Sequence, residues 1–90
     1  MAIYIVAYDL NNEVQRPNII QEIDKTNWAR LSESSYAIET SETVSQVHAR
    51  FRKYLDDDDQ FYVITLSRPW TGQGPRNVNQ WLAQRLGPAG

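Results

Sequence analysis

The sequence lacks cysteine, any long apolar run and an excess of basic residues. Without cysteine the chain has no disulfide, no thiolate metal ligand and no thiol nucleophile, a composition that suits a reducing compartment. The longest apolar run, Ile3 to Tyr8, is too short to cross a membrane, and no basic region precedes it. We therefore expect a cytoplasmic protein with no membrane segment. Nine Lys and Arg against eleven Asp and Glu give a net charge of −2, which disfavours binding of nucleic acid over the whole surface.

Length and apolar content indicate a single folded domain. The chain has 90 residues, of which 41% are hydrophobic and 11% aromatic, too many for a disordered chain. We expect one domain over residues 1–86 and a flexible tail at residues 87–90. A domain of this size buries only about 60% of its unfolded surface, so association with a second copy would add stability.

Hydrophobic periodicity predicts four strands. The strand expected at Ile3–Tyr8 is apolar on both sets of alternate positions, and so is the centre of the strand expected at Gln60–Ser67. This pattern is typical of strands with both faces buried. We expect a hairpin of two strands at Trp28–Leu31 and Ser35–Thr40. Apolar and polar residues alternate in the strand expected at Ser35–Thr40.

Three helices are expected between and after these strands. A first helix is expected to begin at Pro17, because proline suits the first helical position, where its missing N–H is no loss. Thr43 and Gln46 have the spacing of a capping box at the start of a second helix. Asn77 and Gln80 are expected to cap a last helix. This helix carries the apolar residues Val78, Trp81, Leu82 and Leu86.

The order of the elements predicts an α+β fold, a ferredoxin-like βαββαβ sandwich with an additional C-terminal helix. In that arrangement two helices cover one face of a four-stranded antiparallel sheet. The first and last strands are nevertheless apolar on both faces. We therefore expect the second face to be covered by the third helix, by a second copy of the chain, or by both, which makes a homodimer the expected assembly.

Two segments resemble the small CRISPR-associated adaptation proteins, a family of ferredoxin-like homodimers. The first strand ends in Tyr8 to Leu10 and is followed by Arg16. The family's first strand likewise ends in Tyr-Asp and an aliphatic residue before a basic helix start. In the hairpin, Arg30, Ser34 and Tyr36 fit the family's run of Arg, aliphatic, Gln, any residue, Ser, aliphatic and aromatic. Within the family the SinR-like relatives are the most similar, because they share the Tyr-Asp-Leu-Asn opening and a tryptophan-bearing last helix.

The resemblance implies a dimeric domain that works on nucleic acid, either as a metal-dependent nuclease or as a nucleic-acid-associated adaptor. It also makes Asp9 the expected catalytic residue. The family's late strand pairs with the other protomer, and in this sequence the predicted last helix replaces it. The resemblance therefore implies a dimer without fixing its geometry.

Asp9 is a candidate metal ligand because it lies where a strand leaves the sheet. Hard cations such as Mg²⁺ bind carboxylate oxygens and retain several waters. One carboxylate makes a poor site, whereas a two-fold axis would bring Asp9 and its copy together around one shared ion that activates water. The same side chain also suits an Asx-type turn before Asn11 and Asn12, in which it accepts local backbone N–H groups. The residues alone leave both interpretations open.

Four further residues are candidate nucleic-acid contacts. Arg16 and Arg30 have the charge and geometry to bind phosphate, although solvated surface arginines are common. Tyr36 is able to stack on a base, but its position in an alternating strand equally predicts a core residue. Tyr8 shares the Tyr-Asp motif and is also expected in the core, with its hydroxyl hydrogen-bonded.

Three other features have more ordinary explanations. Asp56 to Asp59 lack the spacing and central glycine of a calcium loop, so we expect a solvated turn that ends the second helix. His48 has no recognisable partner for a nucleophilic triad. The segment from Arg68 to Arg76 contains glycines and Trp70, which would suit a phosphate or a base. It lacks the Walker lysine, so a turn in which Trp70 packs on the last helix is the favoured alternative.

Two hypotheses about function follow. In the first, the protein is a dimeric Mg²⁺-dependent phosphodiesterase with paired Asp9 side chains, or an adaptor on nucleic acid, with Arg16 and Arg30 as phosphate contacts. In the second, it is a non-enzymatic dimeric module that binds another protein through the sheet face or the Trp70 loop. The acidic balance of the chain favours the second hypothesis, so enzymatic activity stays an open question.

Overall fold

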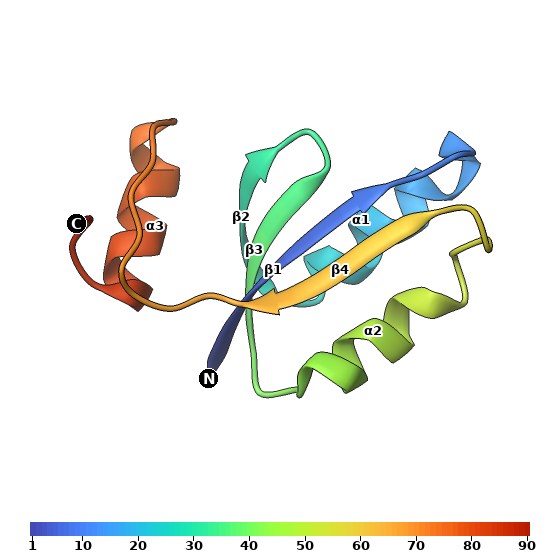
Figure 1. Cartoon of the computed structure of the whole chain (residues 1–90), viewed down its shortest axis with the longest axis horizontal. Coiled ribbons are helices and arrows are strands. Elements are labelled where there is room, and N and C mark those ends of the chain that lie inside the picture. The colour runs from blue at the N-terminus through green and yellow to red at the C-terminus, as the bar shows by residue number, and fades with distance from the viewer.

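The computed structural model describes residues 1–90 as a four-stranded antiparallel sheet with helices packed against it. In chain order the elements are β1 (Ala2–Asp9), the short 3-10 helix η1 (Glu13–Gln15), α1 (Arg16–Asp24), β2 (Asn27–Ser32), β3 (Ser35–Thr40), α2 (Val44–Arg52), β4 (Gln60–Thr65) and α3 (Arg76–Leu86). The strand order across the sheet is β2-β3-β1-β4. The expected ferredoxin-like α+β fold with an additional C-terminal helix is therefore confirmed (Figure 1).

The hydrophobic core lies between the sheet and the two helices α1 and α2. Alternate side chains of β1 point to this side of the sheet, where the helices present one apolar face each. The core consists of Tyr4, Val6, Tyr8, Leu10, Ile19, Ile23, Tyr36, Ile38, Val47 and Phe51. Figure 1 shows α1 running behind the strands and α2 lying beside β4. No helix is long and apolar enough to span a membrane.

Two of the three predicted helix starts are confirmed. Pro17 occupies the first turn of α1. Thr43 and Gln46 form the capping box of α2: the Gln46 N–H donates to the Thr43 hydroxyl at 3.2 Å, and the Thr43 N–H donates to the Gln46 side chain at 2.8 Å. The predicted cap at Asn77 is wrong, because Pro75 is the N-cap of α3 and Asn77 lies inside the first turn. The Pro75 carbonyl accepts the N–H groups of Val78 and Asn79 at 3.1 Å each, which makes Pro75 the last residue before the helix.

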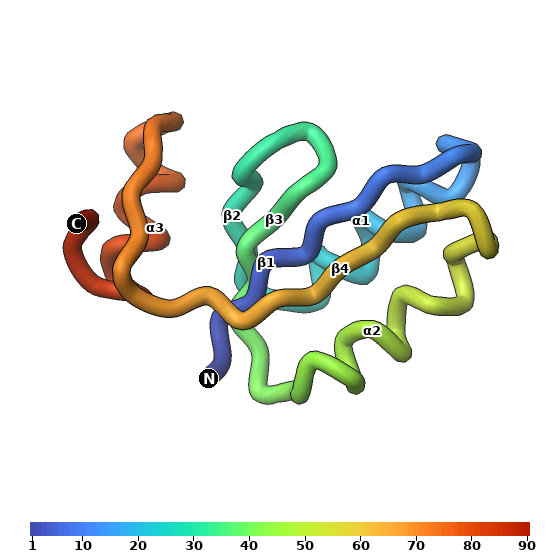
Figure 2. Tube along the Cα trace, in the orientation of Figure 1, coloured from blue at the N-terminus to red at the C-terminus, as the bar shows by residue number.

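Helix α3 covers only one end of the second sheet face. The indole N–H of Trp81 donates to the Asn27 side chain at 3.0 Å, and the Arg85 guanidinium lies 3.3 Å from the Glu39 carboxylate. These contacts join α3 to the β2–β3 side of the sheet, and Figure 2 shows α3 beyond β2, on the opposite side from β4. On β4 the side chains of Tyr62 and Ile64 are consequently 61% and 56% exposed.

The C-terminal residues fold back onto the segment between β4 and α3. The Trp70 indole N–H donates to the Gly87 carbonyl at 2.7 Å, and the Gly90 N–H donates to the Trp70 carbonyl at 2.8 Å. Gly87 has a φ of 95°, which favours glycine, and it ends α3. Trp70 therefore packs at the end of the last helix, as one of the two sequence interpretations expected.

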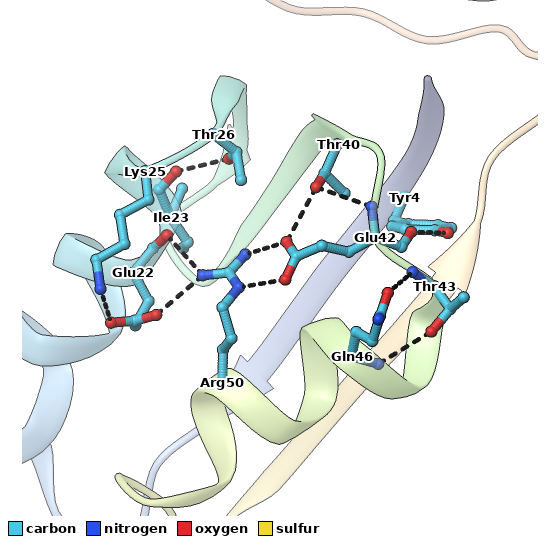
Figure 3. A network of polar contacts seen from close by, with 10 residues as sticks. All are labelled: Tyr4, Glu22, Ile23, Lys25, Thr26, Thr40, Glu42, Thr43, Gln46 and Arg50. Atoms are coloured by element: carbon cyan, nitrogen blue, oxygen red, sulfur yellow. Dashed lines mark hydrogen bonds and ion pairs between the residues drawn. The ribbon is translucent and has the colours of Figure 1, made fainter.

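Arg50 joins α1, α2 and the turn before α2 through a partly buried ionic network (Figure 3). The Glu22 side chain is almost fully buried, with the residue 3% exposed. Arg50 donates to the Glu22 carboxylate at 2.9 Å and makes two parallel bonds to Glu42, at 2.8 and 2.9 Å. Lys25 completes the network with a bond of 2.7 Å to Glu22. Such two-pronged arginine–carboxylate contacts fix geometry as well as adding energy.

Both glutamates of this network are held in their ionised form. Burial raises the pKa of Glu22, but the hydrogen bonds from Lys25 and Arg50 outweigh it and leave that pKa below its ordinary value. The hydrogen bonds from Arg50 also lower the pKa of Glu42, against the opposing effect of burial. Since both pKa values are lower in the folded than in the unfolded chain, this stabilisation is present above the ordinary value of 4.5 and is lost as the pH falls below it.

We expect Arg50→Met to lower the free energy of unfolding near neutral pH by about 3 kcal/mol, because it leaves a buried carboxylate with only one partner. Arg52→Met is the matched control, since Arg52 is exposed on the same helix and forms no ion pair. Urea denaturation of both variants and the wild type tests this. At a pH low enough to protonate both glutamates the deficit of Arg50→Met should shrink, because their charge is then lost. An equal deficit at both pH values would contradict the assignment.

Candidate functional site

Tyr8 and Asp9 end β1 on opposite faces of the sheet, because side chains alternate along a strand. Tyr8 is 5% exposed and belongs to the core. Asp9 is exposed and lies on the face opposite α1 and α2. The register pairs Tyr8 with Phe61 and Asp9 with Gln60, so Asp9 shares its face with the exposed ring of Tyr62. The alternation of side chains along β1 thus places the two residues of the Tyr-Asp motif on opposite faces of the sheet.

The local turn predicted as an alternative for Asp9 is made by another residue. Asn12 is the N-cap of η1, and its side-chain oxygen accepts the N–H of Val14 at 3.1 Å. A second local carboxylate, Asp59, accepts the backbone N–H groups of Asn11 and Asp56 at 2.8 Å each. The side chain of Asp9 accepts no hydrogen bond from its own chain. The Asx-type turn therefore does not explain Asp9.

Asp9 borders a hollow of about 220 Å³ at the end of β1. Leu10, Asn11, Asp58 and Gln60 complete its lining. The polar side chains here offer only carboxylate and amide oxygens, the ligands that Mg²⁺ prefers. Asp9 and Asp58 are its only two carboxylates, and no group of three His, Cys, Asp or Glu side chains in the chain is arranged to hold a metal ion. The donor type fits Mg²⁺, and a further carboxylate from a second copy would complete the set.

Arg16, a predicted phosphate contact, uses its guanidinium inside the domain. It forms a two-pronged ion pair with Glu13 at 2.6 and 3.1 Å, and it donates to the Glu33 carbonyl and the Ser34 hydroxyl at 3.1 Å each. The same group lies over the Tyr8 ring, 5.2 Å from the ring centre, with a long contact of 3.4 Å to the hydroxyl. Arg16 thereby ties the start of α1 to the β2–β3 turn and the end of β1.

The electrostatics of this contact follow from burial and from the ion pair. Burial raises the pKa of Tyr8, outweighing the opposing effect of Arg16, so the phenol stays protonated at neutral pH. The hydrogen bonds between Glu13 and Arg16 lower the pKa of Glu13 and raise that of Arg16. A phosphate at this position would have to displace the Glu13 carboxylate.

The other two predicted contacts differ in accessibility. Tyr36 is 6% exposed and packs edge-on against Trp28, with ring centres 5.6 Å apart, so its ring belongs to the core. Arg30 lies opposite Tyr36 in the β2–β3 register. It is exposed, donates only to the Ser32 carbonyl at 3.2 Å and forms no ion pair. Of the four predicted nucleic-acid contacts, Arg30 is the one with a free charge.

The structure therefore brings Tyr8, Arg16 and Ser34 together and places Asp9 on the other side of the sheet. The two segments that resemble the CRISPR-associated family thus meet through Arg16 and Ser34. The residues Asp56 to Asp59 form the loop after α2, as expected. His48 is exposed and stacks against Phe61, with ring centres 6.1 Å apart.

Sequence reasoning missed a groove between the outer edge of β2 and the first turns of α3. We name it the β2–α3 groove; it has a volume of about 430 Å³ and is lined by Trp28, Ala29, Arg30, Pro75, Asn77, Val78 and Trp81. Its two tryptophans are far apart in the sequence, and no local sequence pattern indicates that they line the same groove. Only the docking of α3 on the β2 side of the sheet brings them to one groove.

Comparison with known proteins supports the fold. No protein-family model matches the chain. The structure is similar to the crystal structure of the hypothetical protein TT1823 from Thermus thermophilus, with a TM-score of 0.68 and 18% sequence identity. The similarity covers 82% of this chain and 92% of that chain. At this identity the likeness concerns the arrangement of helices and strands, and it agrees with the ferredoxin-like fold.

We expect Arg16→Lys to lower the free energy of unfolding by about 1 to 2 kcal/mol although the charge is kept, because an ammonium cannot reproduce the planar set of five N–H donors. Arg76→Lys is the control, since Arg76 is exposed and forms no ion pair. Urea denaturation of both variants is the measurement. A loss for Arg16→Lys no larger than for the control would show that the ties between α1, the hairpin turn and β1 contribute nothing.

Proposed function

We propose that the protein is a cytoplasmic homodimer that works on nucleic acid, a SinR-like relative of the CRISPR-associated adaptation proteins. In this proposal it cleaves phosphodiester bonds with a Mg²⁺ ion shared by the Asp9 side chains of the two copies. The observation that carries the proposal is the position of Asp9. Its carboxylate is exposed on the uncovered sheet face and accepts no hydrogen bond within its own chain.

The uncovered face supports the dimer. Tyr62 and Ile64 are exposed on β4, next to Ala7 and Ile5 of β1 in the antiparallel register. Burying one large apolar side chain contributes about 1.5 to 3 kcal/mol, so a second copy placed here gains substantially. A contact with two-fold symmetry presents the same patch from both copies. Because Asp9 belongs to this face, both Asp9 side chains then lie at one interface.

The chemistry of the hollow supports a hard cation. Asp9 would be the shared ligand, with Asp58 and Asn11 beside it. A bound Mg²⁺ ion supplies Lewis-acid activation of water and of a phosphate oxygen. The part of Asp9 in this scheme is to hold the ion at the interface. Arg30 is the predicted phosphate contact with an uncompensated charge, whereas Glu13 neutralises Arg16.

A second candidate function is a non-enzymatic dimeric module that binds another protein. Two observations favour it: the donors of Arg16 are occupied inside the domain, and the chain is acidic overall. In this case the uncovered face, or the segment around Trp70, would contact the partner. Asp9 would then be replaceable without functional loss.

Cleavage of labelled RNA, single-stranded DNA and duplex DNA separates the two candidates. With Mg²⁺ or Mn²⁺ we expect cleavage by the wild type, and we expect EDTA to abolish it. Asp9→Asn should lower the rate by at least about 100-fold with an unchanged melting temperature, because it removes a ligand of the ion. Asp57→Asn, at an exposed carboxylate that does not border the hollow, is the matched control. Absence of cleavage, or cleavage that survives Asp9→Asn, would favour the protein-binding module.

A further inference from the structure

Two immobilised indole rings line the β2–α3 groove, one from each face of the sheet. Trp28 pairs with Ile38 of the core face, whereas Trp81 contacts Asn27 on the face that α3 covers. The Trp28 N–H donates to the Asp24 carboxylate at 2.8 Å, and the Trp81 N–H donates to the Asn27 side chain at 3.0 Å. Trp28 also packs edge-on against Tyr36, and the Arg85 guanidinium lies 4.0 Å from the centre of the Trp81 ring. Both rings are thus held in place before any ligand arrives, which reduces the entropy that binding would lose.

The occupied indole N–H groups restrict the kind of ligand. A tryptophan with a free indole N–H can donate it to a peptide carbonyl. Neither Trp28 nor Trp81 has a free N–H, so both offer the groove aromatic surface only. A flat heteroaromatic ring can use such a surface by stacking, without needing a hydrogen-bond donor from the tryptophan. This favours a nucleobase over a peptide bound through its backbone carbonyls.

The charge of the groove favours an anion. Its lining contains one cation, Arg30, and no carboxylate, although the chain as a whole has eleven Asp and Glu. Arg30 lies two residues from Trp28 on β2, so both side chains project to the same side of the strand, about 7 Å apart along it. The guanidinium retains free N–H donors for a phosphate, because it bonds only one carbonyl.

We propose that the β2–α3 groove binds single-stranded nucleic acid, with a base stacked on Trp28 and a backbone phosphate on Arg30, which projects to the same side of β2. Its volume of about 430 Å³ suits a group of nucleotide size. Recognition by stacking and by a phosphate contact tolerates any base. Duplex nucleic acid is excluded as a ligand of the groove, because its bases are stacked on one another and cannot enter.

The inference deepens the proposed association with nucleic acid and rests on it to that extent, but it requires neither a metal nor Asp9. The groove lies at the β2 edge, whereas Asp9 pairs with the β4 edge on the opposite side of the sheet. Binding is therefore measured in EDTA, where no cleavage occurs. Loss of binding with retained cleavage would count against the groove alone, and loss of cleavage with retained binding against Asp9 alone.

The test is fluorescence anisotropy of the full chain with labelled twelve-nucleotide oligo(U) and oligo(dT), and with a duplex of the same length. We expect the single strands to bind and the duplex to bind at least about tenfold more weakly. Arg30→Gln should weaken binding about tenfold and make the salt dependence shallower by about 0.7 in log–log slope, as for one lost phosphate contact. Trp28→Leu should weaken binding at least about tenfold. Arg52→Gln, outside the groove, is the matched control and should bind as the wild type does.

Several outcomes would overturn the proposal. It fails if the single strands do not bind, or if Arg30→Gln binds them with the affinity and salt slope of Arg52→Gln. It fails equally if free uridine monophosphate competes as strongly as the oligonucleotide, since the groove would then be a mononucleotide site. Saturable binding of a proline-rich peptide in place of the single strand would assign the groove to a protein partner. Arg30→Gln removes no ion pair, so the binding measurement on this variant stays informative even if Trp28→Leu does not fold.

Discussion

Side chains alternate along β1, and this period of two sends Tyr8 into the core and Asp9 to the uncovered face of the sheet. The apolar set of β1 must face α1 and α2, because a shift by one residue would expose it to water. The position of Asp9 is thus a consequence of core packing and needs no local interaction to hold it. The same alternation in β4 places Tyr62 and Ile64 beside it. An exposed carboxylate and an uncovered apolar strip therefore share one surface.

Helix α3 divides the second sheet face into two regions with different properties. On the β2 side it covers the sheet, pairs Arg85 with Glu39 and creates the β2–α3 groove. On the β4 side the face stays open. Because the two regions lie at opposite edges of the sheet, a dimer through the open region leaves the groove accessible. The proposed dimer and the proposed nucleic-acid site are therefore compatible with each other.

Much of the fold was predictable from the sequence, because its determinants are local. The four strands, the capping box at Thr43 and the helix start near Pro17 each depend on neighbouring residues, and each was confirmed. The apolar pattern of β4 predicted burial on both faces, but its second face is open. Asn77 was mistaken for a cap because its spacing to Gln80 resembles a capping box, while Pro75 set the helix start. The partners of Arg16 and the presence of Trp28 and Trp81 in one groove depend on contacts between distant segments. Sequence patterns of one chain contain no signal for such contacts.

The central claim is that two copies of Asp9 lie together at a two-fold interface, and chemical cross-linking tests it most directly. The chain has no cysteine, so Asp9→Cys introduces a single reactive thiol. A short bis-maleimide should link Asp9→Cys into covalent dimers at concentrations where Asp57→Cys, on an exposed loop beyond the hollow, stays monomeric in denaturing gels. Efficient linkage at position 9 alone is the result that the paired carboxylates predict. Monomeric Asp9→Cys after complete reaction with the linker would show that the two side chains do not meet.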